Sequence, residues 1–81
     1  MTPGARISAA ITVIDAVRGG APAERALTNW ARGARYAGSK DRAAVRDHVF
    51  AVLRRWRSCA VRGGGDGARA LLIGLLRELG I

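Results

Sequence analysis

Between Val45 and Ala60 the apolar side chains recur at intervals of three and four residues, which is the period of an α-helix. At about 100° per residue these positions form one stripe, roughly a third of the circumference wide. Ser39 precedes the pattern as a candidate N-cap and Asp41 falls in the first turn, so the sequence predicts one long helix from Ser39 to about Val61. The stripe consists of Val45, Val49, Val52, Leu53, Trp56, Cys59 and Ala60.

Three other segments show the same helical period, and glycine or proline separates each from its neighbour. They predict helices from Pro3 to Val17, from Pro22 to Gly33 and from Asp66 to Gly80, with Asp66 as a cap. No stretch alternates as a β-strand, so we expect an all-α fold, a small bundle of about four helices in one domain over residues 1–81. The last helix has a leucine face that is expected to be buried: Leu71, Leu72, Leu75, Leu76 and Leu79.

Length and composition restrict the class of protein. With 81 residues, 49% of them hydrophobic and 25% charged, the chain is too apolar for a disordered tail and too charged for a membrane protein. The longest apolar run in the last third is far shorter than the ~20 residues of a membrane span, and no secretory signal is readable. Cys59 is the only cysteine, which excludes an intrachain disulfide. We therefore expect a cytoplasmic location.

Basic residues are concentrated in one part of the chain. Of the formal net charge of +8, a net +7 lies between residues 32 and 62, which hold nine basic and two acidic residues. All but one of the basic residues are arginines, whose planar guanidinium binds phosphate through two hydrogen bonds. Because phosphate contacts release counterions and add affinity, this asymmetry predicts a nucleic-acid partner. The candidate RNA-binding residues are Arg32, Arg35, Lys40, Arg42, Arg46, Arg54, Arg55 and Arg57.

Part of this set forms a ridge on the predicted long helix, beside its apolar stripe. The ridge has one residue every four positions, with Arg57 nearby: Arg42, Arg46, Phe50 and Arg54. A ridge of guanidinium groups is suited to following a phosphate backbone. Two roles are open for Phe50: it either covers the core or offers an aromatic surface to RNA. The alternative interpretation is that these arginines form only a solvated helix face.

No residue pattern typical of catalysis is present. His48 is the only histidine and no carboxylate pair is evident, so we interpret His48 as the edge of the long helix. Trp30, Trp56 and Cys59 fall on apolar stripes and are expected in the core, with the two tryptophans where the second and third helices meet. The run Gly63–Gly67 lacks phosphate-loop spacing and favours a flexible linker. We predict no catalytic residue, metal site or cofactor site in this chain.

Four short motifs together resemble a known family. The motifs are Ala23-Glu24-Arg25-Ala26-Leu27, Ser39-Lys40-Asp41-Arg42-Ala43-Ala44-Val45-Arg46, Val49-Phe50 and Leu53-Arg54-Arg55. The pattern is similar to the N-terminal NusB-like domain of the RNA 5-methylcytosine methyltransferases of the Sun/Fmu (RsmB) family, which modify small-subunit ribosomal RNA. The resemblance covers nearly the whole chain, and its most specific part is the S-x-x-D-R-x-x-V start and the V-F-x-x-L-R-R end of the long helix.

The resemblance implies an RNA-binding helical module that docks ribosomal RNA for a separate catalytic domain, which uses S-adenosylmethionine and is absent from this sequence. It further implies that Asp41 and Arg42 cap and brace the long helix, and that Arg46, Arg54 and Arg55 contact RNA. The family's domain is normally a longer bundle, so a truncated or shortened form is expected here. Because the leucines of the fourth helix would then lack partners, we predict a homodimer through the first and fourth helices.

Two other functions compete with RNA binding. NusB-like bundles also serve as docking partners in transcription antitermination, so the chain could be a helical protein-interaction module whose charge marks an acidic partner. Salt separates these hypotheses, because phosphate binding weakens steeply with salt whereas a leucine-mediated contact scarcely changes. A DNA-binding helix-turn-helix is less well supported, since the junction Trp30–Gly38 is long for its usual turn of three or four residues.

Overall fold

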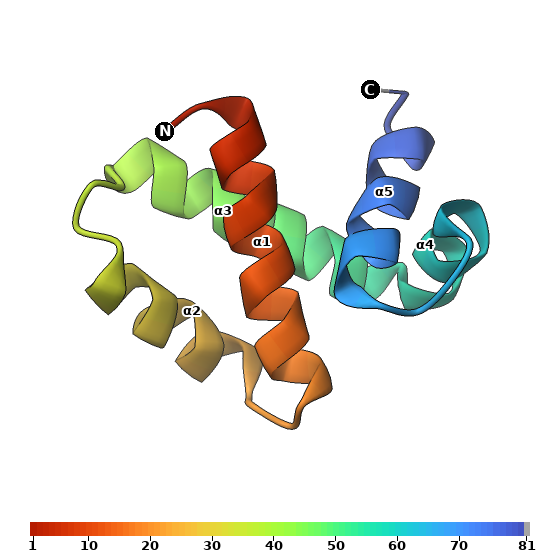
Figure 1. Cartoon of the computed structure of the whole chain (residues 1–81), viewed down its shortest axis with the longest axis horizontal. Coiled ribbons are helices and arrows are strands. Elements are labelled where there is room, and N and C mark those ends of the chain that lie inside the picture. Colours follow the sequence, from red (N-terminus) through yellow and green to blue (C-terminus); the bar gives the residue numbers. More distant parts are fainter. Residues whose placement is uncertain (81) are drawn as a thin grey trace.

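The computed structural model describes residues 1–80, and these form five α-helices without a strand. In Figure 1, α1 crosses α3 near the centre, α2 lies to one side of this crossing, and α4 and α5 lie to the other. The all-α prediction is therefore confirmed, with one helix more than expected. The helices are α1 (Pro3–Arg18), α2 (Ala23–Gly33), α3 (Ser39–Arg54), α4 (Trp56–Gly63) and α5 (Ala68–Glu78).

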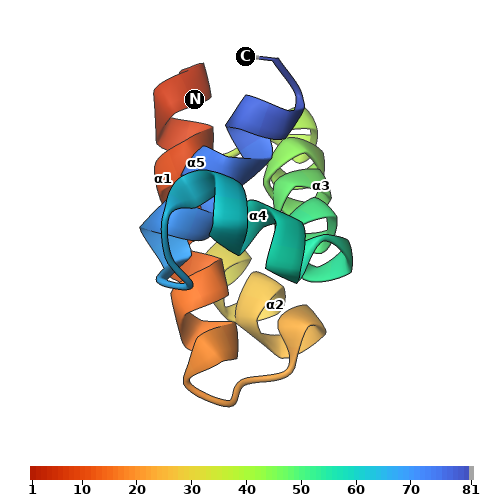
Figure 2. The same cartoon turned by 90° about the vertical axis from the view of Figure 1, so that its right-hand side faces the viewer.

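The additional helix arises because the predicted long helix is broken at Arg55. The backbone at Arg55 adopts φ −125° and ψ 33°, which is outside the helical region, so α3 ends at Arg54 and α4 begins at Trp56. The apolar period continues across the break, and neither glycine nor proline stands there, so the sequence carries no signal for it. The turn allows α4 to pack along α5, which Figure 2 shows from their side.

Two glycines allow α4 and α5 to pack with their backbones in contact. A Cβ atom on Gly74 of α5 would lie 1.9 Å from the carbonyl oxygen of Cys59 in α4. One on Gly63 would lie 1.8 Å from the carbonyl oxygen of Ala70. No side chain fits at either position, so the glycines determine this close approach. The first glycine of the run is therefore the last residue of α4, and Gly64 closes the helix with a positive φ of 81°.

The caps of two helices differ from the prediction. Ser39 is the first residue of α3 rather than its N-cap, and Gly38 occupies the cap position. The carboxylate of Asp41 accepts a hydrogen bond from the backbone N–H of Gly38 at 3.0 Å, so Asp41 caps the helix from its first turn. Asp66 does not cap α5, because Gly67 holds that position without a side-chain hydrogen bond.

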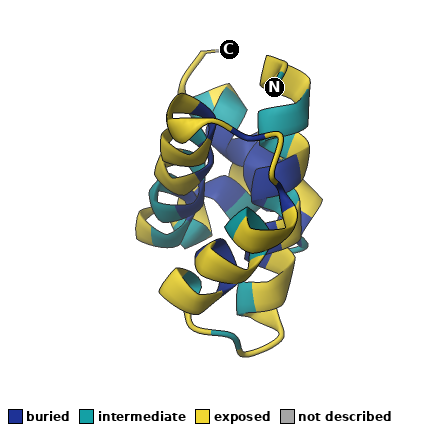
Figure 3. Ribbon diagram, turned by 90° about the vertical axis from the view of Figure 1, so that its left-hand side faces the viewer, coloured by how far each residue is buried: buried dark blue, intermediate teal, exposed yellow. Residues whose placement is uncertain are grey.

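The core lies where α1, α3 and α5 meet, and Figure 3 shows the buried residues on the inner sides of the helices. Cys59 is fully buried there as predicted, and burial raises the pKa of its thiol. The leucine face of α5 is buried only in part, since Leu76 is half-buried and Leu79 is 49% exposed. No helix within residues 1–80 has the length and apolar character to cross a membrane. The largest fully buried side chains are Val13, Ile14, Val45, Val49, Val52, Cys59, Leu71, Leu72 and Leu75.

Candidate nucleic-acid interface

All eight predicted RNA-binding residues are exposed; seven of them fall into two groups, and Arg46 lies between these groups on α3. Arg42 and Arg54 lie at opposite ends of α3, about 18 Å apart along the axis, and Arg57 belongs to α4 beyond the break. We call the first group the α2–α3 basic cluster: Arg32 at the end of α2, Arg35 in the connection, and Lys40 and Arg42 in the first turn of α3. The second, the α3–α4 basic group, comprises Arg54, Arg55 and Arg57.

Arg46, in the middle of the predicted ridge, is held by Glu24 of α2. Its two terminal nitrogens donate to the two carboxylate oxygens at 2.9 and 2.5 Å. These hydrogen bonds lower the pKa of Glu24 and raise that of Arg46, because each ion stabilises the other. The guanidinium also lies 4.8 Å from the centroid of the Phe50 ring, and Phe50 is half-buried against the core. Arg46 therefore joins α2 to α3 and is not free for phosphate.

Arg55, at the other end of the molecule, is also paired with a carboxylate, that of Glu78. A terminal nitrogen of Arg55 lies 3.5 Å from one carboxylate oxygen of Glu78, and Nε of Arg62 lies 3.4 Å from the other. The Glu78 side chain is only 10% exposed, so its charge is compensated by these two cations. Among residues 1–80, Arg54 and Arg57 form no ion pair, and they are the free charges of the α3–α4 basic group.

Asp41, the one buried charged residue within the described part of the chain, faces α1. Its carboxylate accepts a hydrogen bond from Nε of Arg6 at 2.9 Å and lies 3.4 Å from the terminal ammonium of Met1. The hydrogen bond from Arg6, followed by that from Gly38, lowers the pKa of Asp41. Sequence reasoning assigned Asp41 only to capping, because no local pattern indicates a partner thirty-five residues away.

This arrangement leaves the α2–α3 basic cluster without a compensating acid. Asp41 is the acidic residue nearest to the cluster in the sequence, and its charge is shared with Arg6 and the Met1 ammonium. Within residues 1–80, none of the four cluster cations takes part in an ion pair, Arg42 included, so the predicted bracing role of Arg42 has no contact behind it. The cluster is therefore a region of uncompensated positive charge on the surface.

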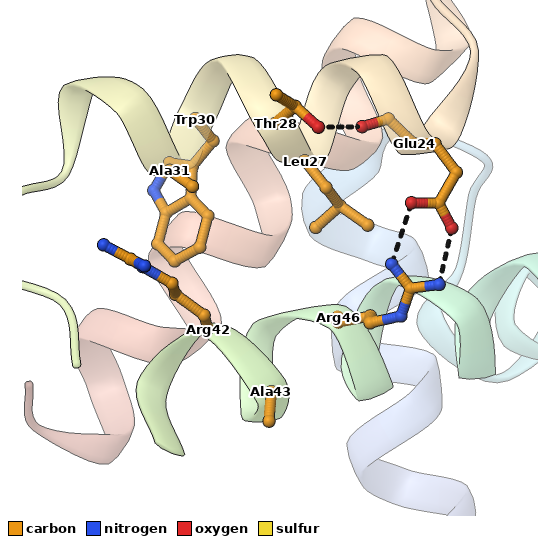
Figure 4. Close-up of a pocket in the computed structure, with 8 residues that line it drawn as sticks. All are labelled: Glu24, Leu27, Thr28, Trp30, Ala31, Arg42, Ala43 and Arg46. Atoms are coloured by element: carbon orange, nitrogen blue, oxygen red, sulfur yellow. Dashed lines mark hydrogen bonds and ion pairs between the residues drawn. The ribbon is translucent and has the colours of Figure 1, made fainter. Parts of the chain in front are cut away.

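A groove of about 230 Å³ separates α2 from α3 beside this cluster. Figure 4 shows the Trp30 indole and Arg42 at one end and the Glu24–Arg46 pair at the other. Sequence reasoning missed the groove because it assigned Trp30 to the contact between these helices. The side chain is indeed half-buried against the core, but it also lines the opening. The remaining lining residues are Leu27, Thr28, Ala31 and Ala43.

The side chains that commonly serve in catalysis or metal binding do not gather into a site within residues 1–80. His48 is half-buried on α3, and burial is the main cause that lowers its pKa. Residues 1–80 hold no group of three or more His, Cys, Asp or Glu side chains that could bind a metal ion. The arginine clusters and the groove are thus the surface features that bear on function.

No protein-family model matches the chain, and no curated protein or solved structure is significantly similar to it. The fold class follows from the five helices themselves. The likeness to NusB-like domains rests on the sequence motifs alone.

Proposed function

We propose that this chain is a noncatalytic RNA-binding domain, the NusB-like N-terminal module of a ribosomal RNA (cytosine-5) methyltransferase of the Sun/Fmu type. The observation that carries the proposal is the uncompensated charge of the α2–α3 basic cluster. Cations without acidic partners attract a polyanion, and arginine forks fit phosphate oxygens. In this proposal the cluster makes the main phosphate contacts, and Arg54 and Arg57 extend them along α3 and into α4.

Arg46 and Arg55 belong to the proposed surface in a different way from the other six residues. Each is paired with a carboxylate, Glu24 or Glu78, so phosphate must displace that partner before it can bind. The Glu24–Arg46 pair is exposed to solvent, which favours exchange of the carboxylate for a phosphate group, whereas the Glu78 side chain is only 10% exposed and releases Arg55 less readily. We accordingly place these two arginines in a secondary role.

The proposal gives the glycine run a role in the fold and not in binding the methyl donor, S-adenosylmethionine. Gly63 faces the backbone of Ala70, and Gly64 closes α4 with a positive φ. In the proposal the donor binds the separate catalytic domain, which is a partner of this module together with ribosomal RNA. The module itself positions RNA and needs no cofactor.

A salt-dependent titration tests the proposal, with a small-subunit ribosomal RNA hairpin and a duplex DNA of equal length as ligands. The variant Lys40→Gln/Arg42→Gln removes two cluster charges, whereas Arg25→Gln/Arg69→Gln removes two exposed arginines outside both groups. The proposal expects tighter binding to RNA than to DNA. It also expects the slope of log K against log salt to flatten by about 0.7 per lost contact in the cluster variant.

The control variant decides between a site and a general charge effect. If both double variants weaken RNA binding equally, or if RNA and DNA bind alike, the charge is a solvated face and the proposal is overturned. Arg46→Glu/Arg54→Glu adds a second comparison, because it tests the ridge of α3 directly. If salt scarcely changes the affinity for RNA while binding to a protein partner is retained, the result favours the protein-interaction module.

The homodimer stays a prediction, with a smaller contact surface than the sequence indicated. Leu71, Leu72 and Leu75 are buried within the chain, so they are not available to a second copy. The apolar surface that remains is a groove of about 240 Å³ between α1 and α5. Sedimentation equilibrium at high micromolar concentration tests the dimer, and a monomer of 8.5 kDa would count against it. The apolar side chains of this groove that remain partly exposed are Ile7, Ile11, Ile73 and Leu76.

A further inference from the structure

We propose that the groove between α2 and α3 binds one unpaired base of a single-stranded RNA segment. The base stacks on the Trp30 indole, and the adjoining phosphate lies at Arg42. This inference rests on the proposed RNA-binding function and adds to it a site that contacts a base. It also predicts that the domain distinguishes single strands from duplexes.

The lining of the groove suits the flat face of a base. Leu27, Ala31 and Ala43 present small or apolar groups between the two helices, and Trp30 adds an aromatic face. Every base has such a face, and stacking on an aromatic side chain tolerates any sequence. Within residues 1–80, the Glu24–Arg46 pair is the only side-chain hydrogen-bonded link between α2 and α3. No other such link among these residues crosses the groove between the two helices.

The charges at the two ends of the groove give a bound nucleotide a direction. At one end Arg42 has no acidic partner within the described residues, and the flanking cluster adds Arg32, Arg35 and Lys40. At the other end the Glu24 carboxylate already occupies both terminal nitrogens of Arg46 and repels an incoming anion. A phosphate is therefore favoured at Arg42, and the base is directed toward Trp30 and Leu27.

Trp30 is placed to serve both the core and the ligand. It is half-buried and packs against the core cluster, which fixes the orientation of the indole. The part of the ring that lines the groove stands beside Arg42 in Figure 4. A fixed aromatic ring loses little conformational entropy on binding, so stacking contributes more of its energy to affinity. Paired bases in a duplex cannot enter the groove, because their faces are already stacked within the helix.

Tryptophan fluorescence tests the site, because the chain has only Trp30 and Trp56. In the variant Trp56→Phe, Trp30 is the sole reporter, and a single-stranded RNA oligonucleotide should quench its emission at low salt. A duplex RNA of the same sequence should leave the emission nearly unchanged. The matched variant Trp30→Phe retains only Trp56, which stands beside Arg54 and Arg57, so its emission reports phosphate binding there and should change alike with single-stranded and duplex RNA.

Affinity measurements on two further variants complete the test. Trp30→Leu removes the aromatic face and should weaken single-strand binding about tenfold, with duplex binding unaffected. Ala43→Phe fills the groove from α3 without truncating the core, and it should weaken single-strand binding in the same selective way. The second variant keeps the inference testable if Trp30→Leu fails to fold by circular dichroism.

The outcomes separate the groove from the wider proposal. The groove inference is wrong if RNA binds with a steep salt slope but the emission of Trp30 does not change. It is also wrong if Trp30→Leu and Ala43→Phe both bind single strands with the parent's affinity. In either case the RNA-binding proposal survives. If Trp30 responds equally to duplex RNA, selective base binding is also excluded. If no RNA binds at low salt, both the groove and the proposed function fail.

Discussion

The two ends of the molecule are built in opposite ways. At one end, α4 and α5 touch backbone to backbone through Gly63 and Gly74, and Glu78 pairs with arginines of this end. At the other end, α2 and α3 are separated by a groove, and the four cations of the α2–α3 basic cluster beside it have no acidic partner within residues 1–80. The mostly buried carboxylate of Glu78 thus draws two arginines into the close-packed end, whereas the cluster beside the groove keeps four cations that a ligand can use.

The largest expected effect comes from breaking the close-packed end. Gly74→Ala places a Cβ atom 1.9 Å from the carbonyl oxygen of Cys59, where the backbone of α4 cannot yield without moving the helix. Overpacking against a side chain lowers the free energy of unfolding by about 1–3 kcal/mol. Because the contact here is with backbone, we expect Gly74→Ala to lower it by about 3 kcal/mol or more. Urea denaturation measures the loss in the free energy of unfolding.

Gly33→Ala is the matched control at the open end. Gly33 is the last residue of α2, and a Cβ atom there would meet nothing within 4 Å. Since alanine favours the helix, this variant should be unchanged or more stable by up to about 1 kcal/mol. Equal destabilisation of the two variants would contradict the contrast between the ends.

The second-largest effect concerns Asp41, whose carboxylate links the start of α3 to residues of α1 and the N-terminus. Asp41→Asn removes a carboxylate that Arg6, the Met1 ammonium and the Gly38 N–H all contact, so the melting temperature at pH 7 should fall. The fall should be smaller than that of Gly74→Ala. Asp15→Asn is the control, because the exposed Asp15–Arg18 pair contributes little.

The pH dependence of this effect follows from the lowered pKa of Asp41. Because the folded pKa lies below the unfolded value of about 3.9, the stabilisation is complete above that value and is lost as the pH falls through the folded pKa. The difference in melting temperature between the parent protein and Asp41→Asn should therefore be constant near neutral pH and shrink below about pH 4. A difference that persists in acid would show that the charge of Asp41 is not the cause.

Local periodicity predicted much of the fold. Apolar spacing located the helical segments and placed Val45, Val49 and Cys59 in the core, because a helix face is determined by residues three and four positions apart. The break at Arg55 escaped prediction, since the period continues through it and the cause is the packing of α4 on α5. The close approach at Gly74 also escaped prediction, because it depends on Cys59, fifteen residues earlier.

The candidate site was less predictable than the fold, because charge pairing joins distant residues. Composition identified the basic segment, and its eight candidate residues are exposed. The sequence contains no signal that Arg46 pairs with Glu24, twenty-two positions away, or that Asp41 pairs with Arg6. Those pairs decide which cations are free. The predicted ridge therefore lies on α3 as expected, but its middle arginine, Arg46, is paired, and only Arg42 and Arg54 at its ends have no acidic partner within residues 1–80.

The smallest expected effect distinguishes the two ends by charge alone. Glu24→Gln releases Arg46 at the open end, so RNA affinity should rise a few-fold and the salt slope should steepen by about 0.7 if one phosphate contact is gained. Glu78→Gln releases Arg55 and Arg62 at the close-packed end. Because the Glu78 side chain is only 10% exposed, this change leaves cations poorly compensated beside α5, and its main result should be lower stability.

Parallel RNA titrations and thermal melts of both variants measure this difference. A fall in RNA affinity for Glu24→Gln would mean that the Glu24–Arg46 link is needed to keep the groove in shape, so that its structural role outweighs the released charge. A rise of equal size in both variants would show that RNA responds to total charge and not to its position. Affinity that rises only at the open end requires that the cations beside the groove contact RNA directly.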